Sequence, residues 1–557
     1  MTRLTRPMRM TITVAVLAAA VGLSSAGPSS ARVSRSKVEP ADVITLLPLS
    51  TSSDRRIVDS QGREVLLRGA NVNSLGEYWQ GVPTIDPTIP IVDADWAEMA
   101  SRGFSVVRLL ITWSRVEPTK GTIDEAYLDT VDAAVQAAAA HGIYTVIDMH
   151  QDAYTAFIHT SNPADCAPGT TPAKGWDGAP AWAVLTDGLS TCLTNGERNS
   201  SPAVNRAWNN FYDNVDGIRD EFVAAWSAVA GHFKGRPEVA GYDVLNEPEN
   251  PRAAADLKPI YEDFLADAIA GIRAAEAGAS FEHLIIIEPA LPAGDFSRGL
   301  VIPDPAAAGV DTKNIVASVH NYAESIDTGL GLTIEGTNDL IESVTKDLGV
   351  ASWGGEYGFW DTSATTLAKA RRYAADEDKH AWGGAWWQWR QSCGDPHAVS
   401  WSGGSIVAPT DVSTHLHKLQ CPGNGDRGPT DEFLDIVGRG YPRAVPGRIT
   451  QLRSDPATGL MKVKATATQA GGQLVVWTPT ADDADHPINV FGLTDVVAHD
   501  VAGGRLITAT VTAKGTYALW VGPVDEDLST PASSTTTTTQ PASTPAEAVP
   551  GNPSYTG

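Results

Sequence analysis

Two glutamates stand where apolar runs of the sequence turn polar. Glu247 follows Asn246 near the end of the run 239–248, VAGYDVLNEP, and Glu356 lies in the run 350–358, VASWGGEYG. A carboxyl pair can cleave a glycosidic bond when one group is protonated to assist the leaving oxygen and the other is ionised to attack or stabilise the oxocarbenium ion. The sequence therefore predicts a catalytic pair, provided that the fold brings the two runs together.

Eight apolar runs rich in β-branched residues alternate with amphipathic helical stretches between about residues 60 and 435. This alternation favours a parallel sheet, and eight such units favour an α/β fold of the (β/α)8 TIM barrel type. Active sites of that barrel lie at the C-terminal ends of its strands, which is the end where these runs turn polar. The runs are 64–74, 105–113, 144–150, 239–248, 283–290, 314–322, 350–358 and 381–389.

Polar side chains at the ends of these runs form the wider candidate site. A lone glutamate at a strand end is more often a structural hydrogen-bond acceptor, so Glu288 competes with the chosen pair. Asn246 distinguishes Glu247, because an amide there can bind a sugar hydroxyl next to the bond that is cut. His150 and His320 have the alternative reading of core histidines with satisfied nitrogens. The candidate substrate-binding residues are Arg108, His150, Asp152, Asn246, His320, Tyr322 and Trp387.

Composition excludes some partners. The chain has 557 residues, a formal net charge of −25 and a sequence pI near 4.8. Phosphate backbones and anionic membranes are bound through basic patches, so we expect no nucleic-acid partner and no polybasic membrane docking. Nothing in the composition indicates a cofactor, and we expect none.

The N-terminus predicts export. Three arginines precede the apolar stretch 11–23, TITVAVLAAAVGL, and small residues follow it. This pattern is typical of a cleaved signal peptide, which we place at residues 1–31 with cleavage after Ala26 or Ala31. A membrane anchor is the alternative, but the stretch is shorter than the roughly 20 residues that span a bilayer. We therefore expect a secreted protein without stable membrane insertion.

Four cysteines in an exported chain predict two disulfides. Cys166 and Cys192 lie in one loop-rich region, and Cys393 and Cys421 lie in another. Of the three possible connectivities we choose the local one, Cys166–Cys192 and Cys393–Cys421. A zinc site is the weaker reading, because no CxxC or HxxxH spacing accompanies the cysteines, and we expect no metal.

The pattern divides the chain into further regions. We assign residues 32–438 to the catalytic barrel, with a long connection between residues 150 and 239 that we interpret as a substrate-binding wall. Residues 439–525 alternate with period two and predict a small β-sandwich. Residues 526–557 are rich in Ser, Thr and Pro and predict a disordered tail, glycosylated or spanning a cell wall. We expect a monomer.

The motifs resemble those of the glycoside hydrolases of clan A, family 5, and the resemblance covers the whole barrel. It implies a retaining mechanism in which Glu247, the glutamate of NEP, is the acid/base and Glu356 is the nucleophile. It also implies that Arg108 keeps Glu356 ionised and that Trp387 stacks under the −1 sugar. His150, His320 and Tyr322 match the family residues around that sugar. The two carboxyl groups of a retaining enzyme lie about 5–5.5 Å apart.

A closer resemblance is to the endoglycoceramidases. It rests on DMHQDAY (148–154), GAPAWAVLTDG (178–188), GGEYG (354–358) and YPRAVPG (441–447). It implies hydrolysis of the β-glycosidic bond between an intact oligosaccharide and the ceramide of a glycosphingolipid, with Asp152 binding hydroxyls of the −1 sugar. Many glucosylceramide-type relatives carry a lysine after the first strand. This chain has none in its loop 71–81, which favours galactosylceramide-linked substrates of the 6-gala type.

Two other functions compete with this reading. An endo-β-glucanase, or a related polysaccharide hydrolase, would use the same barrel. A non-catalytic carbohydrate-binding surface protein is the alternative from another class, and the presence of both carboxylates argues against it. An apolar slot for lipid tails, expected near the 150–239 connection and residues 391–420, would favour the glycolipid.

Overall fold

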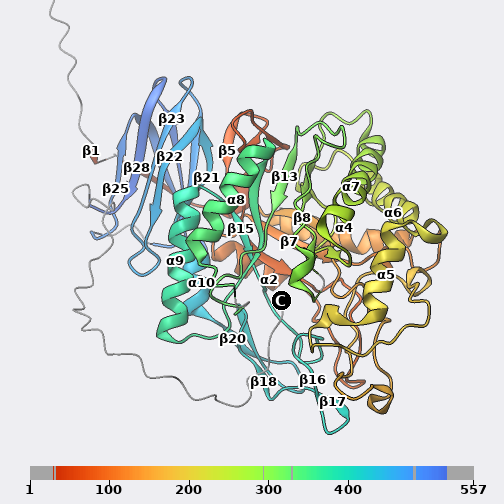
Figure 1. The fold of residues 1–557 in the computed structure, drawn as a ribbon. Helices are drawn as coiled ribbons and strands as arrows, with labels where there is room; N and C mark the ends of the chain where they lie inside the picture. Colours follow the sequence, from red (N-terminus) through yellow and green to blue (C-terminus); the bar gives the residue numbers. More distant parts are fainter. Residues whose placement is uncertain (1–28, 31–32, 293, 328–329, 481–483, 524–557) are drawn as a thin grey trace, which may run out of the picture.

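The structure, a computed structural model, describes residues 29–30, 33–292, 294–327, 330–480 and 484–523. The expected leader, apart from Ser29–Ser30, and the expected tail lie outside these residues. Figure 1 shows a barrel wrapped by helices with strand-rich sheets packed at one side. No described helix is long and apolar enough to cross a membrane.

The described residues form a closed barrel of parallel strands in the order β11-β13-β14-β15-β6-β7-β8-β9. Each strand corresponds to one of the eight predicted runs. All six residues of β7, and all six of β8, are buried, which fits strands covered on both faces. The barrel strands are β6 (Arg68–Val72), β7 (Val106–Ile111), β8 (Tyr144–Met149), β9 (Val239–Asp243), β11 (Leu284–Ile287), β13 (Ile315–Ser318), β14 (Ala351–Tyr357) and β15 (Gly384–Trp386).

Helices cover the outside of the barrel, and their sequences explain where they begin and what they bury. α4 begins after Asp124, whose side chain accepts a hydrogen bond from Tyr127 N, and it buries Leu128, Val131 and Val135 at helical spacing. The α-helices are α1 (Pro40–Val43), α2 (Asp93–Ser101), α3 (Trp113–Val116), α4 (Glu125–Ala140), α5 (Pro202–Tyr212), α6 (Ile218–His232), α7 (Ala254–Glu276), α8 (Ile334–Leu348), α9 (Ala364–His380) and α10 (Asp431–Val437). Short 3-10 turns are η1 (Pro163–Asp165), η2 (Ala181–Ala183), η3 (Arg198–Ser200), η4 (Val215–Gly217) and η5 (Phe296–Arg298).

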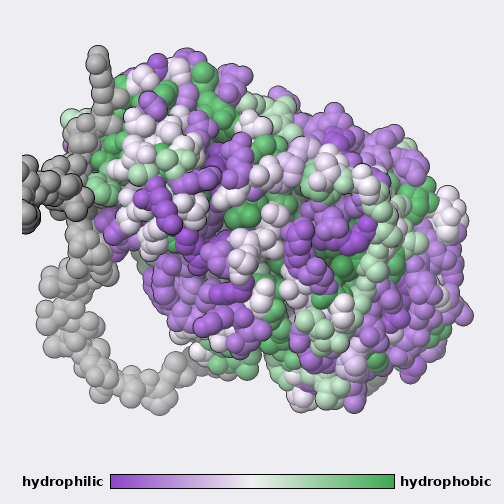
Figure 2. All heavy atoms as spheres, turned by 90° about the horizontal axis from the view of Figure 1, so that it is seen from above, coloured by the Kyte–Doolittle hydropathy of each residue, from purple (hydrophilic) through white to green (hydrophobic). Residues whose placement is uncertain are grey.

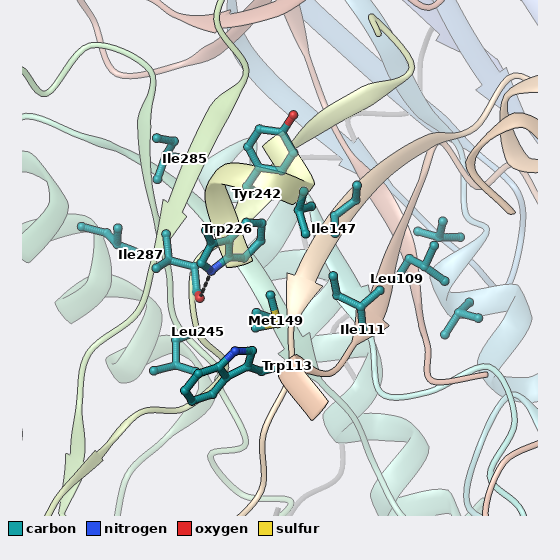
Figure 3. Packing of buried hydrophobic residues seen from close by; sticks show 14 of the residues in the cluster. Leu109, Ile111, Trp113, Ile147, Met149, Trp226, Tyr242, Leu245, Ile285 and Ile287 are labelled. Atoms are coloured by element: carbon teal, nitrogen blue, oxygen red, sulfur yellow. Dashed lines mark hydrogen bonds between the residues drawn. The ribbon is translucent and has the colours of Figure 1, made fainter. Parts of the chain in front are cut away.

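The main core lies between the barrel and these helices. Figure 3 shows Trp226 of α6 beside Tyr242 and Ile287, with its indole Nε1 donating to Val244 O at 2.8 Å. Trp226 has no exposed surface, and Ile287 is 2% exposed. Burying a side chain of this size contributes about 1.5–3 kcal/mol to folding. This packing fixes the strand ends that carry the polar residues.

Two sheets with a shared apolar interior form the C-terminal region. N-terminal strands join both sheets, so the region is not made of residues 439–525 alone. Val65 of β5 pairs with Ala444 of β21, although the expected boundary gives residues 34–65 to the barrel. The run 64–74 does not form the one strand expected from the sequence, because β5 ends at Val65 and β6 begins at Arg68. The strands are β1 (Ser29–Ser30), β2 (Ser34–Lys37), β3 (Leu49–Thr51), β4 (Ile57–Asp59), β5 (Arg63–Val65), β21 (Tyr441–Pro446), β22 (Arg448–Ser454), β23 (Met461–Ala467), β24 (Gln473–Thr478), β25 (Ile488–Phe491), β26 (Leu493–Val501), β27 (Gly504–Val511) and β28 (Gly515–Val521).

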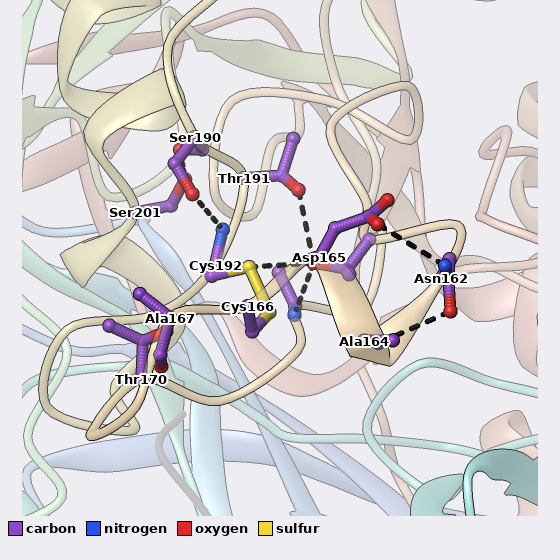
Figure 4. The surroundings of a disulfide bond; sticks show 12 residues. Asn162, Ala164, Asp165, Cys166, Ala167, Thr170, Ser190, Thr191, Cys192 and Ser201 are labelled. Carbon is purple, nitrogen blue, oxygen red and sulfur yellow. Dashed lines mark hydrogen bonds between the residues drawn. A yellow bond between two sulfur atoms is a disulfide. The ribbon is translucent and has the colours of Figure 1, made fainter.

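Two long connections at the C-terminal ends of the barrel strands are stapled by disulfides. The structure pairs Cys166 with Cys192, with Cα atoms 5.6 Å apart, and Figure 4 shows this bond inside the connection after β8. It also pairs Cys393 with Cys421 in the connection after β15. Both pairs are the local ones expected from the sequence. Small strands in these and neighbouring loops are β10 (Glu249–Asn250), β12 (Leu291–Pro292), β16 (Ser400–Ser402), β17 (Ser405–Val407), β18 (Asp411–Val412), β19 (His417–Gln420) and β20 (Gly425–Pro429).

The surface is mainly polar. Figure 2 shows hydrophilic residues over most of one face, with hydrophobic residues in scattered groups. Such scattered groups are normal on soluble domains.

Candidate active site

Arg108 is the centre of the polar cluster inside the barrel. It is fully buried on β7, and its guanidinium reaches several neighbouring strands. Nε donates to Asp243 Oδ2 at 2.9 Å, Nη1 donates to Glu356 Oε1 at 2.9 Å, and Nη2 donates to Glu288 Oε1 at 3.1 Å. Nη2 also lies 3.0 Å from Asp148 Oδ1. A single guanidinium therefore contacts four carboxyl groups.

Glu356 lies within β14 and is 4% exposed. Besides the bond from Arg108, its Oε2 accepts a hydrogen bond from Tyr322 Oη at 2.9 Å. Burial raises the pKa of Glu356, while the positive charges of His320 and Arg108 oppose that rise. Two donors therefore hold the carboxylate in one orientation, as a nucleophile requires.

Glu247 lies beyond the end of β9, four residues after Asp243, and not in the strand itself. Its backbone has φ +37°, in the left-handed region that costs a non-glycine residue about 1–3 kcal/mol. Three hydrogen bonds hold this conformation. Glu247 N donates to Glu288 Oε2 at 2.8 Å, and Gln151 Nε2 donates to Asn246 O at 2.9 Å and Glu247 O at 2.8 Å. Glu288, a competitor in the sequence, thus positions the backbone of Glu247.

His320 links the two candidate catalytic groups. Its Nδ1 lies 2.8 Å from Glu247 Oε1 and 3.5 Å from Glu356 Oε2. One oxygen of each glutamate and the imidazole nitrogen all lie within 4.8 Å of one another. Burial disfavours the imidazolium, but Glu288 and Glu356 raise the pKa of His320 well above its ordinary value. The two glutamates thus lie closer together than an inverting pair, and the raised pKa of His320 favours the imidazolium, which does not ligate a metal.

Asn246, His150 and Trp387 line the site beside the glutamates. Asn246 Oδ1 accepts from Arg108 Nη2 at 3.0 Å, and its Nδ2 donates to Gln151 O at 3.0 Å. The ring of His150 stacks on that of Trp387, with centroids 5.4 Å apart and planes 17° apart. His150 Nδ1 lies 2.7 Å from Asp148 Oδ2, and burial lowers the pKa of His150 to about 4, so the ring is neutral.

Asp152 lies beside this group and has two charged partners that sequence reasoning missed. Its Oδ1 is 2.6 Å from Arg198 Nη2, and its Oδ2 is 3.0 Å from His397 Nε2. The same Arg198 Nη2 donates to Glu247 Oε2 at 3.1 Å. Burial alone would raise the pKa of Asp152, but Arg198 and His397 hold it well below its ordinary value. Asp395 Oδ1 lies 2.8 Å from His397 Nδ1 and completes the group.

The structure therefore brings all the predicted site residues into one region. Arg198 lies in the connection after β8, which a disulfide cross-links, and His397 lies in the connection after β15. Neither residue lies at the end of a barrel strand, so the strand pattern does not predict it. The only signal for His397 is its spacing from Asp395 in CGDPHAV. Two close carboxyl groups, a shared imidazole and an aromatic ring beside them can together cleave a glycosidic bond.

Comparison with known proteins agrees with this geometry. The model of the cellulase family, glycosyl hydrolase family 5, matches residues 58–392. Endoglycoceramidase I of Rhodococcus hoagii (strain 103S) is 25% identical over 532 residues, which cover 89% of this chain and 90% of that protein. The endoglycoceramidase of Cyanea nozakii is 31% identical over 221 residues, covering 37% and 43%. A crystal structure of an endogalactoceramidase has a TM-score of 0.75 and 34% identity, and the match covers 85% of this chain and 100% of that one.

Proposed function

The chain belongs to the cellulase family, glycosyl hydrolase family 5, and we propose that it is a secreted retaining endoglycosidase that cleaves the β-glycosidic bond between the oligosaccharide and the ceramide of glycosphingolipids. The observation that carries the hydrolysis is the placement of Glu247 and Glu356, with oxygens within 4.8 Å of each other. Inverting enzymes separate these groups by about 6.5–9.5 Å to admit a water, whereas retaining enzymes hold them about 5–5.5 Å apart.

In the proposed first step Glu356 attacks the anomeric carbon while Glu247 protonates the ceramide oxygen. Arg108 and Tyr322 each donate to Glu356, which leaves its carboxylate fixed toward the sugar. A covalent glycosyl-enzyme forms, and ceramide departs with the proton from Glu247. Glu247 then takes a proton from a water molecule while the water oxygen attacks the anomeric carbon and the bond to Glu356 breaks, which releases the sugar with its original configuration. His320 contacts both carboxyl groups and fixes their positions relative to each other.

The lipid substrate is supported by two kinds of observation. An endogalactoceramidase and endoglycoceramidases match over most of the chain. Large apolar side chains are also exposed on the connections that follow the barrel strands, at the end of the barrel that carries the site. These are Phe157 at 43%, Leu189 at 41%, Phe296 at 62%, Leu300 at 48%, Leu332 at 46% and Val407 at 38% exposed.

Preference for galactose at the −1 position is part of the proposal. The similar endogalactoceramidase supports it, as does the absence of lysine from residues 64–119 of this chain. The leader-like N-terminus and the two disulfides support export. We propose that the exported enzyme acts as a monomer, possessing all the site residues in one chain.

Side-by-side assays test the substrate. A 6-gala glycolipid, ganglioside GM1 and carboxymethyl cellulose are incubated with the enzyme and with its Glu356→Gln variant. The proposal predicts intact oligosaccharide and ceramide from the glycolipids, fastest from the 6-gala lipid, and nothing from the variant. Release of sugar from the cellulose alone would make the protein a polysaccharide hydrolase instead.

A further inference from the structure

A second polar cluster lies beside Asp152. It contains Tyr78 from the loop after β6, Asp177 from the connection after β8, and Arg198 from η3. Backbone bridges join the segments, because Tyr78 pairs with Asp177 and Asp152 also pairs with Asp177. The cluster therefore joins three segments of the chain. The proposed catalytic steps use neither Tyr78 nor Asp177.

Four polar atoms of this cluster have no hydrogen-bond partner among the described residues. They are Tyr78 Oη, both carboxyl oxygens of Asp177 and Arg198 Nη1. The three side chains are 4%, 0% and 7% exposed. Each buried polar group without a partner costs about 1–3 kcal/mol, so a cluster of four in one place points to a ligand that supplies the partners.

The distances fit a hydroxyl group. One oxygen each of Asp152 and Asp177 and one nitrogen of His150 lie within 4.8 Å of one another. His150 Nδ1 is engaged by Asp148, whereas Nε2 has only a long contact of 3.5 Å with Asn246 Nδ2 and can also accept a hydrogen bond from a ligand. An oxygen atom between such groups can make hydrogen bonds of ordinary length, about 2.7–3.0 Å, to more than one of them.

The surroundings favour an uncharged ligand with both donor and acceptor capacity. Burial raises the pKa of Asp177 well above its ordinary value; Asp152 and Asp395 add to the rise and Arg198 opposes it. The oxygens of Asp177 can accept a hydrogen bond, Arg198 Nη1 can donate one and Tyr78 Oη can do both, and these capacities together match a hydroxyl. A metal ion would instead meet the positive charge of Arg198.

The neighbouring ring identifies the kind of molecule that carries the hydroxyl. His150 stacks on Trp387, so a ligand held at Nε2 lies next to the indole face. Polar groups on one edge and an aromatic face beside them suit a pyranose, which has hydroxyls on its rim and apolar C–H groups on its faces.

We propose that Asp177, together with Tyr78 and Arg198, binds a hydroxyl of the sugar at the cleavage site and that Asp177 determines which hydroxyl pattern the enzyme accepts. The inference rests on the proposed function, because it assigns the hydroxyl to the sugar that Glu247 and Glu356 cleave.

The test combines Asp177→Asn with substrates that lack single hydroxyls. Rates are measured on 4-nitrophenyl β-galactoside and its 3-deoxy and 4-deoxy analogues. Asp187→Asn is the matched control, because Asp187 is an aspartate of the same connection whose side chain is 59% exposed. We expect Asp177→Asn to lower kcat/KM on the parent glycoside about 10- to 100-fold, as the loss of a buried hydrogen bond does, and Asp187→Asn to change it less than about 3-fold.

Coupling between the two changes decides the inference. One deoxy analogue should lose a similar factor with the wild-type enzyme, but the same analogue and Asp177→Asn together should lose little more than either alone. Independent, multiplying losses for both analogues, or an unchanged rate for Asp177→Asn, would overturn the proposal. Thermal melting of each variant shows whether a lost rate reflects unfolding, and Tyr78→Phe gives a second probe of the same hydroxyl.

A binding measurement separates this inference from the proposed function. Calorimetry compares the binding of methyl β-galactoside to Glu356→Gln and to Glu356→Gln/Asp177→Asn. Weaker binding by the double variant supports the hydroxyl site even if the wild type hydrolyses no glycoside, in which case only the proposed function fails. Equal binding by both, together with normal hydrolysis by the wild type, leaves the proposed function intact and refutes the role of Asp177.

Discussion

Two buried arginine–carboxylate clusters differ in their balance of charge. At the contact between the barrel and the C-terminal sheets, Arg68 and Arg439 face Glu377 and Asp378. Arg68 lies 3.4 Å from Glu377 and 2.9 Å from Asp378, and Arg439 lies 2.6 Å and 2.8 Å from the same two groups. Two cations thus meet two anions. Burial would raise the pKa of Asp378, but Arg439 and Arg68 bring it below its ordinary value.

The cluster around Arg108 has an excess of carboxyl groups. One guanidinium faces Asp148, Asp243, Glu288 and Glu356. Burial and neighbouring carboxylates raise the pKa of Asp148 to about 8, although Arg108 opposes the rise, and burial raises the pKa of Asp243 well above its ordinary value. Even with the imidazolium of His320 beside Glu288 and Glu356, the four carboxyl groups outnumber the cations, so they cannot all be ionised.

The difference in charge balance between the two clusters indicates where proton transfer is possible. A balanced cluster keeps one protonation state and serves as a structural contact, whereas a cluster with surplus carboxyl groups must hold protons that can move. Perturbed pKa values of that kind mark functional sites. The first two predictions below compare a residue of each cluster, and the next two concern neighbouring groups of the active site. They are given in order of decreasing expected effect.

Glu356→Gln should abolish activity and leave the fold intact. The amide cannot form the glycosyl-enzyme, so we expect kcat on an aryl glycoside to fall by about 10⁴-fold or more. Three carboxyl groups still surround Arg108, so the melting temperature should remain close to that of the wild type. Stopped assays and thermal melts on the same preparation check both parts. Substantial residual turnover would remove Glu356 from the mechanism.

Asp378→Asn should have the opposite profile. It leaves Arg68 and Arg439 with only Glu377 as a charged partner, which should lower the free energy of unfolding by about 3–5 kcal/mol. The kcat of the folded enzyme should not change. Asp339→Asn is the control, because Asp339 pairs with Lys379 at the surface, where both side chains are more than half exposed, and should cost less than about 1 kcal/mol. Equal effects of the two variants in urea unfolding would contradict the comparison.

Glu247→Gln should affect activity according to the leaving group. The loss of a general acid costs about 10²–10⁴-fold when the departing oxygen needs a proton, as in a ceramide or alkyl glycoside. A dinitrophenyl glycoside departs without that proton, so its glycosylation step should be much less impaired in a pre-steady-state burst. An identical loss on both substrates would mean that Glu247 is not the proton donor.

His397 should make stability fall as the pH rises. Burial opposes its charged form, but Asp395 and Asp152 raise its pKa to about 9, above the unfolded value of about 6.5. The folded state therefore binds more protons between these values, and stability present below about pH 6.5 is lost as the pH rises through 9, by about 3 kcal/mol. His397→Gln should lose that pH dependence in urea unfolding at pH 6 and 9. A wild-type stability that is flat over this window would refute the assignment.

The sequence predicted the barrel because each strand is a buried apolar run with its own local pattern. It also predicted the polar strand ends, including Arg108 and Glu356, since those residues follow the same pattern. The N-terminal strands β2–β5 were not predicted, because they are short, and because β2 and β5 join the sheet through β26 and β21, which lie far along the chain. Arg198 and His397 were missed for a related reason: both come from irregular connections, and only tertiary packing brings them to Asp152.

The most direct test of the account is to trap the covalent intermediate. The enzyme is mixed with 2-deoxy-2-fluoro-β-galactosyl fluoride, whose fluorine slows the second step, and the labelled peptide is identified by mass spectrometry. The account predicts one fluorogalactosyl group on the carboxyl of Glu356, in the peptide that contains WGGEYG. A label on Glu247 or another residue, or an inverted product formed without any label, would contradict it.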